Sequence, residues 1–77
     1  MEGIVTVDLH GKNQYQARVT IDSALRRCDG SVYLIHGCRG GTALRDMIWR
    51  EYKTHAKVRR MLLSPDGGTT ELVLREL

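Results

Sequence analysis

The feature that most constrains the fold is a glycine-rich stretch near the middle of the chain. Residues 32–35 form a continuous apolar run, and His36 then leads into a turn that holds Gly37, Gly40 and Gly41. A helical pattern follows, so the stretch predicts a buried strand, a glycine turn and a helix. Unpaired backbone N–H groups and the positive end of the helix dipole face such a turn. The stretch therefore predicts an anion-binding site, and phosphate is the expected anion.

The segments on either side predict further strands and helices. Residues 4–9 alternate between apolar and polar side chains and are rich in β-branched residues, which is typical of a strand. A capping-box start at Asn13 and Gln16 precedes apolar side chains at helical spacing over residues 14–28, and Gly30 is expected to close that helix. The remaining expected elements are a strand at 32–35, a helix from 42 to about 53–55, a strand at 58–63, a turn at 64–68 and a strand at 71–75.

The order of these elements is βαβαββ, in one domain that covers residues 1–77. A strand–helix–strand unit makes the first two strands parallel through a right-handed crossover, and a tight turn makes the last pair antiparallel. The predicted fold class is α/β, more closely an α+β two-layer sandwich with a mixed four-stranded sheet and two helices.

The charge is unevenly distributed along the chain. Positions 1–38 carry four positive and four negative side chains, whereas positions 39–60 carry seven positive and two negative, a net +5. A basic segment that starts at a phosphate-type turn favours a polyanionic partner, and nucleic acid is the first candidate. The alternative interpretation is a solvated helix face.

Composition also limits the compartment. The start of the chain lacks a signal-peptide pattern, and no apolar run is long enough to span a membrane. Cys28 and Cys38 do not have metal-binding spacing, so we expect thiols in a reducing compartment, with Cys28 in the core. These features predict a cytoplasmic protein with no membrane partner.

Two turns are expected to meet at one edge of the sheet. Residues 8–11 end the first strand and residues 36–37 end the second, and ligands of parallel α/β sheets bind outside the carboxyl ends of the strands. Two histidines, one carboxylate and the glycine turn therefore converge on that edge.

These motifs resemble those of a known family, the small MutS-related (Smr) domain. Residues 8–11 match its aspartate-leucine-histidine-glycine motif in full, at the end of the first strand. Residues 36–41 resemble its histidine-glycine-x-glycine-x-glycine loop, with Arg39 at the usual place of the middle glycine. Residues 67–74 look like a shortened form of its glycine-glycine and threonine-x-valine-x-leucine ending. The resemblance covers nearly the whole chain.

The resemblance implies a fold similar to the C-terminal domain of a bacterial translation initiation factor. It implies binding to DNA or RNA and, as in several members, nicking of DNA or cleavage of RNA. It also implies a stand-alone member, whose partner domains come from other proteins or from self-association; the sequence leaves the oligomeric state open.

The residue types at this edge suit phosphodiester cleavage. A histidine can take and return a proton near neutral pH, and a carboxylate two positions away on a strand can orient it. The predicted catalytic residues are Asp8, His10 and His36. The predicted phosphate- and nucleic-acid-binding residues are Gly11, Lys12, Gly37, Arg39, Gly40, Gly41, Thr42 and Arg45.

Structural alternatives stand beside these roles. His36 can instead fix the turn by hydrogen bonds to the backbone, and Asp8 can satisfy N–H groups of its own turn. A single carboxylate is a poor ligand set for a two-metal nuclease, so we expect metal dependence to be weak or absent and no other cofactor; the sequence does not indicate a divalent metal but leaves one open. The remaining cations of residues 50–60 are expected to be solvated charge.

Two aromatic side chains have alternative interpretations. Tyr15, beside the predicted site, either packs at the surface or stacks on a nucleobase. Trp49 lies off the main apolar face of its helix, so it covers the edge of the last strand or forms a self-association patch.

Three functions are compatible with this sequence. The first is a nucleic-acid-binding Smr-like domain with nicking endonuclease activity, and the second is the same binding domain without catalysis. The third is a protein-interaction domain that docks an acidic partner on its basic segment.

Overall fold

Six elements follow one another in the computed structural model, which describes residues 1–76. They are β1 (Glu2–Asp8), α1 (Gln14–Arg27), β2 (Cys28–Ile35), α2 (Ala43–Glu51), β3 (Arg60–Leu63) and β4 (Thr69–Val73). The predicted order βαβαββ is confirmed, as are the four strands and two helices of a mixed α+β fold.

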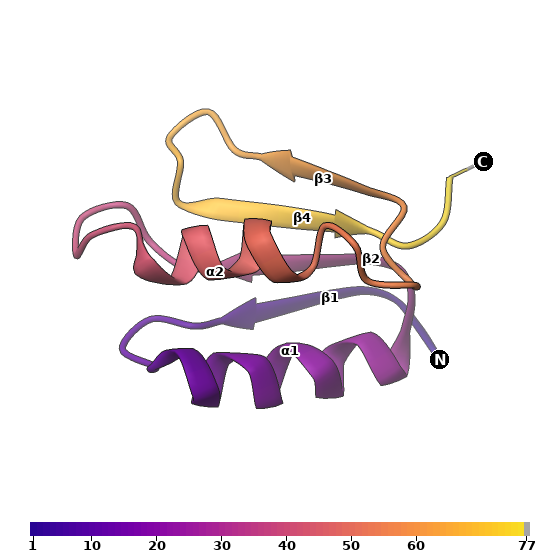
Figure 1. Ribbon diagram of the computed structural model, residues 1–77. Coiled ribbons are helices and arrows are strands. Elements are labelled where there is room, and N and C mark those ends of the chain that lie inside the picture. The colour runs from indigo at the N-terminus through magenta and orange to yellow at the C-terminus, as the bar shows by residue number, and fades with distance from the viewer. Residues whose placement is uncertain (77) are drawn as a thin grey trace.

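The sheet has the strand order β1-β2-β4-β3. β1 pairs with β2 in parallel, whereas β4 is antiparallel to both β2 and β3. β3 therefore runs in the same direction as β1 and β2. The loops that follow these three strands lie at one edge of the sheet, at the left of Figure 1. Both predicted motif turns are among these loops.

Both helices cover the same face of the sheet (Figure 1). The alternation in β1 determines which side chains meet them, because Val5 and Val7 are buried and Ile4 is exposed. Burying each large apolar side chain stabilises the fold by roughly 1.5–3 kcal/mol. The completely buried core includes Leu9, Ile21, Cys28, Leu34, Met47, Ile48 and Leu72.

The start of α1 is the predicted capping box. The Asn13 side chain accepts the N–H of Gln16 at 2.8 Å, and the Gln16 side chain accepts the N–H of Asn13 at 3.0 Å. Neither helix within residues 1–76 has the length and apolar character required to span a bilayer.

α1 ends at Arg27, within one residue of the prediction, but the predicted role of Gly30 in closing this helix is wrong. Gly30 has no left-handed conformation, because β2 begins directly at Cys28 and Gly30 belongs to that strand. A Cβ at Gly30 would lie 2.1 Å from the carbonyl oxygen of Gly3, so this glycine permits a close approach of two strands. The register shift between Glu2 and Ile4 in the β1–β2 pairing occurs at the same place.

The other boundaries differ by a few residues. α2 ends at Glu51, earlier than predicted, and β3 starts only at Arg60 because residues 52–58 form turns. β2 extends back to Cys28, and β4 starts at Thr69 because its two threonines pair with the end of β2. The earlier start of β4 places Thr70 on the buried face of the sheet.

Candidate functional site

The glycine loop between β2 and α2 depends on glycine at two positions. Gly37 has φ 80° and Gly41 has φ 100°, which is the left-handed region that side chains with a Cβ disfavour. Gly40 lies outside that region, so its backbone conformation does not require glycine. A Cβ at any of the three would meet nothing within 4 Å, so the loop is open to a ligand.

The base of this loop is fixed by the β3–β4 turn. The carbonyl oxygen of Gly68 accepts the N–H of His36 at 3.1 Å and that of Gly37 at 2.9 Å. Within residues 1–76, the backbone N–H groups of residues 38–41 donate to no other protein group. These donors are available to an anion above the loop.

The turn after β1 is held by backbone hydrogen bonds, one within the turn and one to the end of β2. Leu9 donates its N–H to Ile35 at 2.8 Å, Lys12 donates to Leu9 at 3.0 Å, and Gly11 has φ 78°. The carboxylate of Asp8 accepts the backbone N–H of His10 at 2.9 Å. Asp8 thus makes the turn contact that the sequence left as an alternative, while the side chain of His10 is exposed.

The two motif turns line one hollow of about 670 Å³, which we name the loop hollow. The predicted convergence of the two strand ends therefore occurs in the structure. Its lining residues are His10, Gly11, Lys12, His36, Gly37, Cys38, Arg39, Gly40, Gly41, Ala43 and Leu44.

Three predicted site residues lie outside the lining of the loop hollow. The Asp8 carboxylate is bonded to its own turn, as described above. The hydroxyl of Thr42 donates to Asp46 at 2.8 Å, and Arg45 lies 3.7 Å from the same carboxylate group. Thr42 and Arg45 therefore contribute to the first turn of α2.

His36 is buried, with 8% of its surface exposed, and both of its ring nitrogens have protein partners. Nδ1 lies 3.0 Å from the carbonyl oxygen of Gly37, and Nε2 lies 2.8 Å from the hydroxyl of Thr70. Trp49 donates its indole N–H to the same hydroxyl at 3.0 Å. Trp49 covers β4, as one of its two predicted roles requires.

The direction of these bonds follows from the groups involved. A carbonyl oxygen only accepts, so the proton of His36 is on Nδ1, and an indole N–H only donates. Thr70 then donates its hydroxyl to Nε2, which leaves every hydrogen in the chain from Trp49 to Gly37 with an acceptor. If Nε2 carried the proton, the buried hydroxyl hydrogen of Thr70 would have no acceptor. This geometry matches the alternative role of His36, which is to fix the glycine turn.

Sequence reasoning missed Thr70 and Gly68 as supports of the loop. Ending the predicted turn at residue 68 and starting the last strand at residue 71 left both of them outside any predicted strand. The alternation of Leu72 and Leu74 on one face, extended by two residues, would have placed Thr70 inward.

The basic segment 39–60 does not form one surface. α2 carries the chain from the loop edge to the opposite edge of the sheet, as Figure 1 shows. Arg60 pairs with Glu76 at 2.8 Å, and Arg50 with Glu51 at 3.4 Å. Arg39 remains at the loop hollow and forms no ion pair within residues 1–76.

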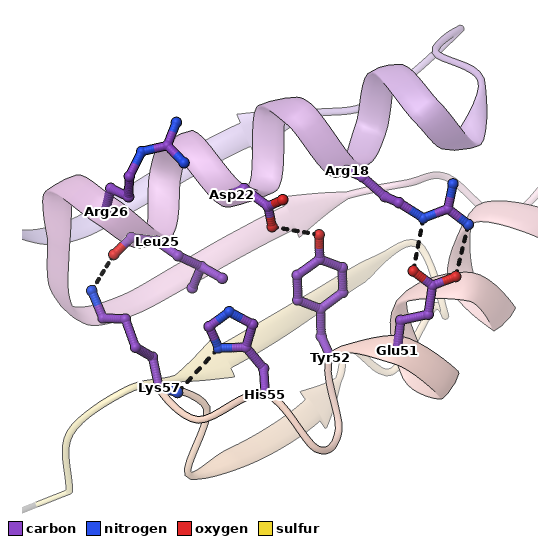
Figure 2. A pocket seen from close by; sticks show the side chains of 8 residues that line it. All are labelled: Arg18, Asp22, Leu25, Arg26, Glu51, Tyr52, His55 and Lys57. Carbon is purple, nitrogen blue, oxygen red and sulfur yellow. Dashed lines mark hydrogen bonds and ion pairs between the residues drawn. The ribbon is translucent and has the colours of Figure 1, made fainter.

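A separate hollow of about 410 Å³ lies between α1 and the end of α2 (Figure 2). Arg18 donates twice to the carboxylate of Glu51, at 2.7 Å each, and the hydrogen bond lowers the pKa of Glu51. The hydroxyl of Tyr52 donates to Asp22 at 2.8 Å. Burial, and next this hydrogen bond, raise the pKa of the Tyr52 phenol. These internal pairs join the two helices.

Lys57 also belongs to this second hollow. Its ammonium group donates to the carbonyl oxygen of Leu25, and it lies 3.4 Å from that of Cys28 (Figure 2). The expectation that Lys57 is solvated charge is therefore wrong, because its ammonium group caps the end of α1.

Metal ligands are not grouped at the loop edge. Among the 76 residues that the structure describes, no three His, Cys, Asp or Glu side chains are placed to hold a metal ion. The cysteines there are free, with Cys28 buried as predicted and Cys38 exposed.

Comparisons with known proteins agree with this geometry. No protein-family model and no curated protein matches the chain. Among solved structures, the crystal structure of the Smr domain of MutS2 from Thermus thermophilus matches with a TM-score of 0.81 and 28% sequence identity. The match covers 94% of this chain and 99% of the other. With both motif turns placed as the resemblance implies, the similarity of this chain to the Smr domain is confirmed over nearly its whole length.

Proposed function

We propose that this Smr-like domain binds nucleic acid at the loop hollow and cleaves a phosphodiester bond there. The observation that carries the proposal is the hollow of about 670 Å³ that both motif turns line. It brings open backbone N–H groups of the glycine loop together with two cations, Lys12 and Arg39. Backbone donors and flexible cations are the groups that bind a phosphate without reading its sequence.

In this proposal the residues at the hollow have separate tasks. The glycine loop holds the phosphate, and Lys12 and Arg39 stabilise the charge that develops on it. His10 is the exposed imidazole. It takes a proton from a water molecule whose oxygen forms a new bond to phosphorus, one phosphorus–oxygen ester bond breaks, and the leaving oxygen takes that proton back from His10. Asp8 holds the backbone of His10 in place, and His36 positions the loop. The proposal needs no metal ion or other cofactor.

A binding domain without catalysis is the second candidate. It is favoured by the bonds of Asp8 and His36, since both of these predicted catalytic groups are occupied by the protein itself. His10 is then the sole free imidazole at the loop hollow among residues 1–76.

Binding is tested by the salt dependence of affinity for an oligonucleotide. The double variant Lys12→Ala, Arg39→Ala should lower the slope of log K against log salt by about 1.8 for duplex DNA, because each lost phosphate contact is worth about 0.9. The control pair Lys53→Ala, Arg59→Ala removes the same charge at the opposite edge and should change the slope less. Equal effects from both pairs would show that the loop hollow is not the binding site. Absence of binding at about 50 mM salt would favour docking of an acidic protein instead.

Cleavage is tested on supercoiled plasmid and on structured RNA, each with and without a chelator. Nicking that persists with the chelator is expected. Binding without any cleavage of either substrate would leave the second candidate, and nicking that the chelator abolishes would contradict the metal-free mechanism.

A further inference from the structure

A third hollow, distinct from the one between α1 and α2, adjoins the loop hollow and extends it onto α1. It has a volume of about 560 Å³ and shares His10, Gly11 and Lys12 with the loop hollow. Its other lining residues are Tyr15, Gln16, Val19 and Thr20, all from the first two turns of α1. We name it the tyrosine hollow. The two form one continuous surface, with Lys12 at their junction.

Tyr15 dominates this surface. Its side chain is 72% exposed, and Val19, one helical turn later, is 52% exposed. Within residues 1–76 the hydroxyl of Tyr15 has no hydrogen-bond partner. The ring is therefore not anchored to the fold.

The other aromatic side chains have structural partners. Trp49 donates to Thr70, Tyr52 is 5% exposed and donates to Asp22, and Tyr33 lies beside Glu71, whose charge raises the pKa of Tyr33. Tyr15 is the aromatic ring that the described part of the fold does not use, and it lies next to the proposed phosphate site.

We propose that the tyrosine hollow holds an unpaired nucleobase stacked on Tyr15, so that the substrate is single-stranded or locally unpaired nucleic acid. The stacking site rests on the binding proposed above for the loop hollow. When the glycine loop holds a phosphate, the base of that nucleotide lies next to the tyrosine hollow, on the other side of Lys12.

Base pairing decides the substrate class. A paired base in a duplex is stacked on both faces by its neighbours, so a side chain outside the helix cannot cover it. An unpaired base exposes a π-face, and any of the four bases can stack with that face on an aromatic ring. The cation at Lys12 favours a nucleotide over an apolar peptide at this place.

The experiment compares oligonucleotides of about 12 nucleotides, which fall within the usual site size of such surfaces. Fluorescence anisotropy measures the affinity for a DNA single strand, an RNA single strand and a blunt DNA duplex at one salt concentration. The variants are Tyr15→Ala, Tyr15→Phe and, as a control on the open face of the sheet, Ile4→Ala, which removes a side chain that is 66% exposed.

Tyr15→Ala should weaken single-strand binding by about 5- to 150-fold, since stacking of one base is worth about 1–3 kcal/mol. Tyr15→Phe should keep the wild-type affinity because it retains the ring, and Ile4→Ala should also keep it. Duplex affinity should be unchanged by Tyr15→Ala.

Three results would overturn the stacking site. An equal loss of duplex and single-strand affinity in Tyr15→Ala would show that Tyr15 contacts the backbone or a groove. Unchanged single-strand affinity in Tyr15→Ala, together with a loss in Lys12→Ala, Arg39→Ala, would remove the stacking site and leave the proposed function intact. If no oligonucleotide binds, the proposed function fails and the stacking site with it.

Discussion

The two motif turns look alike in sequence and differ in what the fold does with them. Each has a histidine followed by a glycine of positive φ at the end of a parallel strand. His10 is exposed with a free ring, whereas His36 is 8% exposed and bonded through both ring nitrogens. The comparison separates a histidine that can meet a substrate from one that holds the loop for it.

The supports of the two turns explain this difference. The turn after β1 relies on the Asp8 carboxylate beside it and on one backbone hydrogen bond from Leu9 to the end of β2. The glycine loop is held from the far end of the chain, by Gly68 on its backbone and by Thr70 on its histidine. A residue that arranges a loop through long-range contacts is a positioning residue, and its loss should be visible in stability.

The largest expected effect is on catalysis at the first turn. His10→Ala should lower the cleavage rate by about 10²- to 10⁴-fold, the range for loss of a general acid–base group. The free energy of unfolding should change by no more than about 0.5 kcal/mol, because the side chain is exposed. Plasmid nicking and urea denaturation measure the two quantities on the same preparation. Cleavage that survives His10→Ala would remove His10 from the mechanism.

The next largest effect is on stability at the second turn. Thr70→Val keeps the side-chain shape but leaves Nε2 of His36 and the indole N–H of Trp49 without partners. A buried polar group without a partner costs about 1–3 kcal/mol, so the loss of partners for two such groups should lower the unfolding free energy by about 2–6 kcal/mol. The matched control, Thr6→Val on the exposed face of β1, should lose less than about 0.5 kcal/mol.

The hydrogen bonds that join His36, Thr70 and Trp49 also predict an NMR signature that burial of the histidine ring alone does not require. The long-range ¹H–¹⁵N spectrum of His36 should show the proton on Nδ1, and Thr70→Val should perturb this spectrum while Thr6→Val should not. A proton on Nε2 in the wild type would contradict the hydrogen-bond directions assigned to Thr70.

A smaller effect is expected from the glycines of the loop. Gly41→Ala should destabilise the fold by about 1–2 kcal/mol, because a Cβ disfavours its φ of 100°. Gly40→Ala lies one position away, has no positive φ and meets nothing within 4 Å, so it should leave the unfolding free energy nearly unchanged. Thermal unfolding of the pair measures the contrast, and equal losses would mean that the glycines are needed for another reason.

The sequence was sufficient to predict the structural features that depend on local residue patterns. Alternation in residues 4–9 and the capping box at Asn13 predicted their elements, and the parallel direction of two strands was enough to bring the motif turns together. The conformations at Gly37 and Gly41 also follow from local turn chemistry.

The parts that failed depend on contacts between distant residues. Gly30 was taken for a helix end because its partner, Gly3, is remote in the sequence. Lys57 was taken for solvated charge because only the fold brings it to the last carbonyl groups of α1. The burial of His36 depends on Thr70, 34 residues away, so a histidine-glycine pair cannot by itself indicate whether its ring is free.

The smallest expected effect is the pH dependence of the support below the glycine loop. In the β3–β4 turn, Asp66 accepts the hydroxyl of Ser64 at 2.7 Å and the N–H of Gly68 at 2.9 Å. These two hydrogen bonds lower the pKa of Asp66. A lowered folded-state pKa stabilises the protein above the unfolded-state value of about 3.9, and this stabilisation disappears as the pH falls through the folded-state pKa.

Urea denaturation of wild type and Asp66→Asn across this range tests the link. The wild type should be more stable at neutral pH, and the two unfolding free energies should converge in acid as Asp66 is protonated. A gap that stays constant with pH would mean that the turn is held by its backbone alone. Because Gly68 joins this turn to the backbone of His36 and Gly37, phosphate binding at the glycine loop should weaken over the same pH range in the wild type and not in Asp66→Asn. Among the described residues, the first motif turn has no hydrogen bond to the β3–β4 turn. The same titration therefore distinguishes the glycine loop, which the β3–β4 turn supports, from the first motif turn, which it does not support.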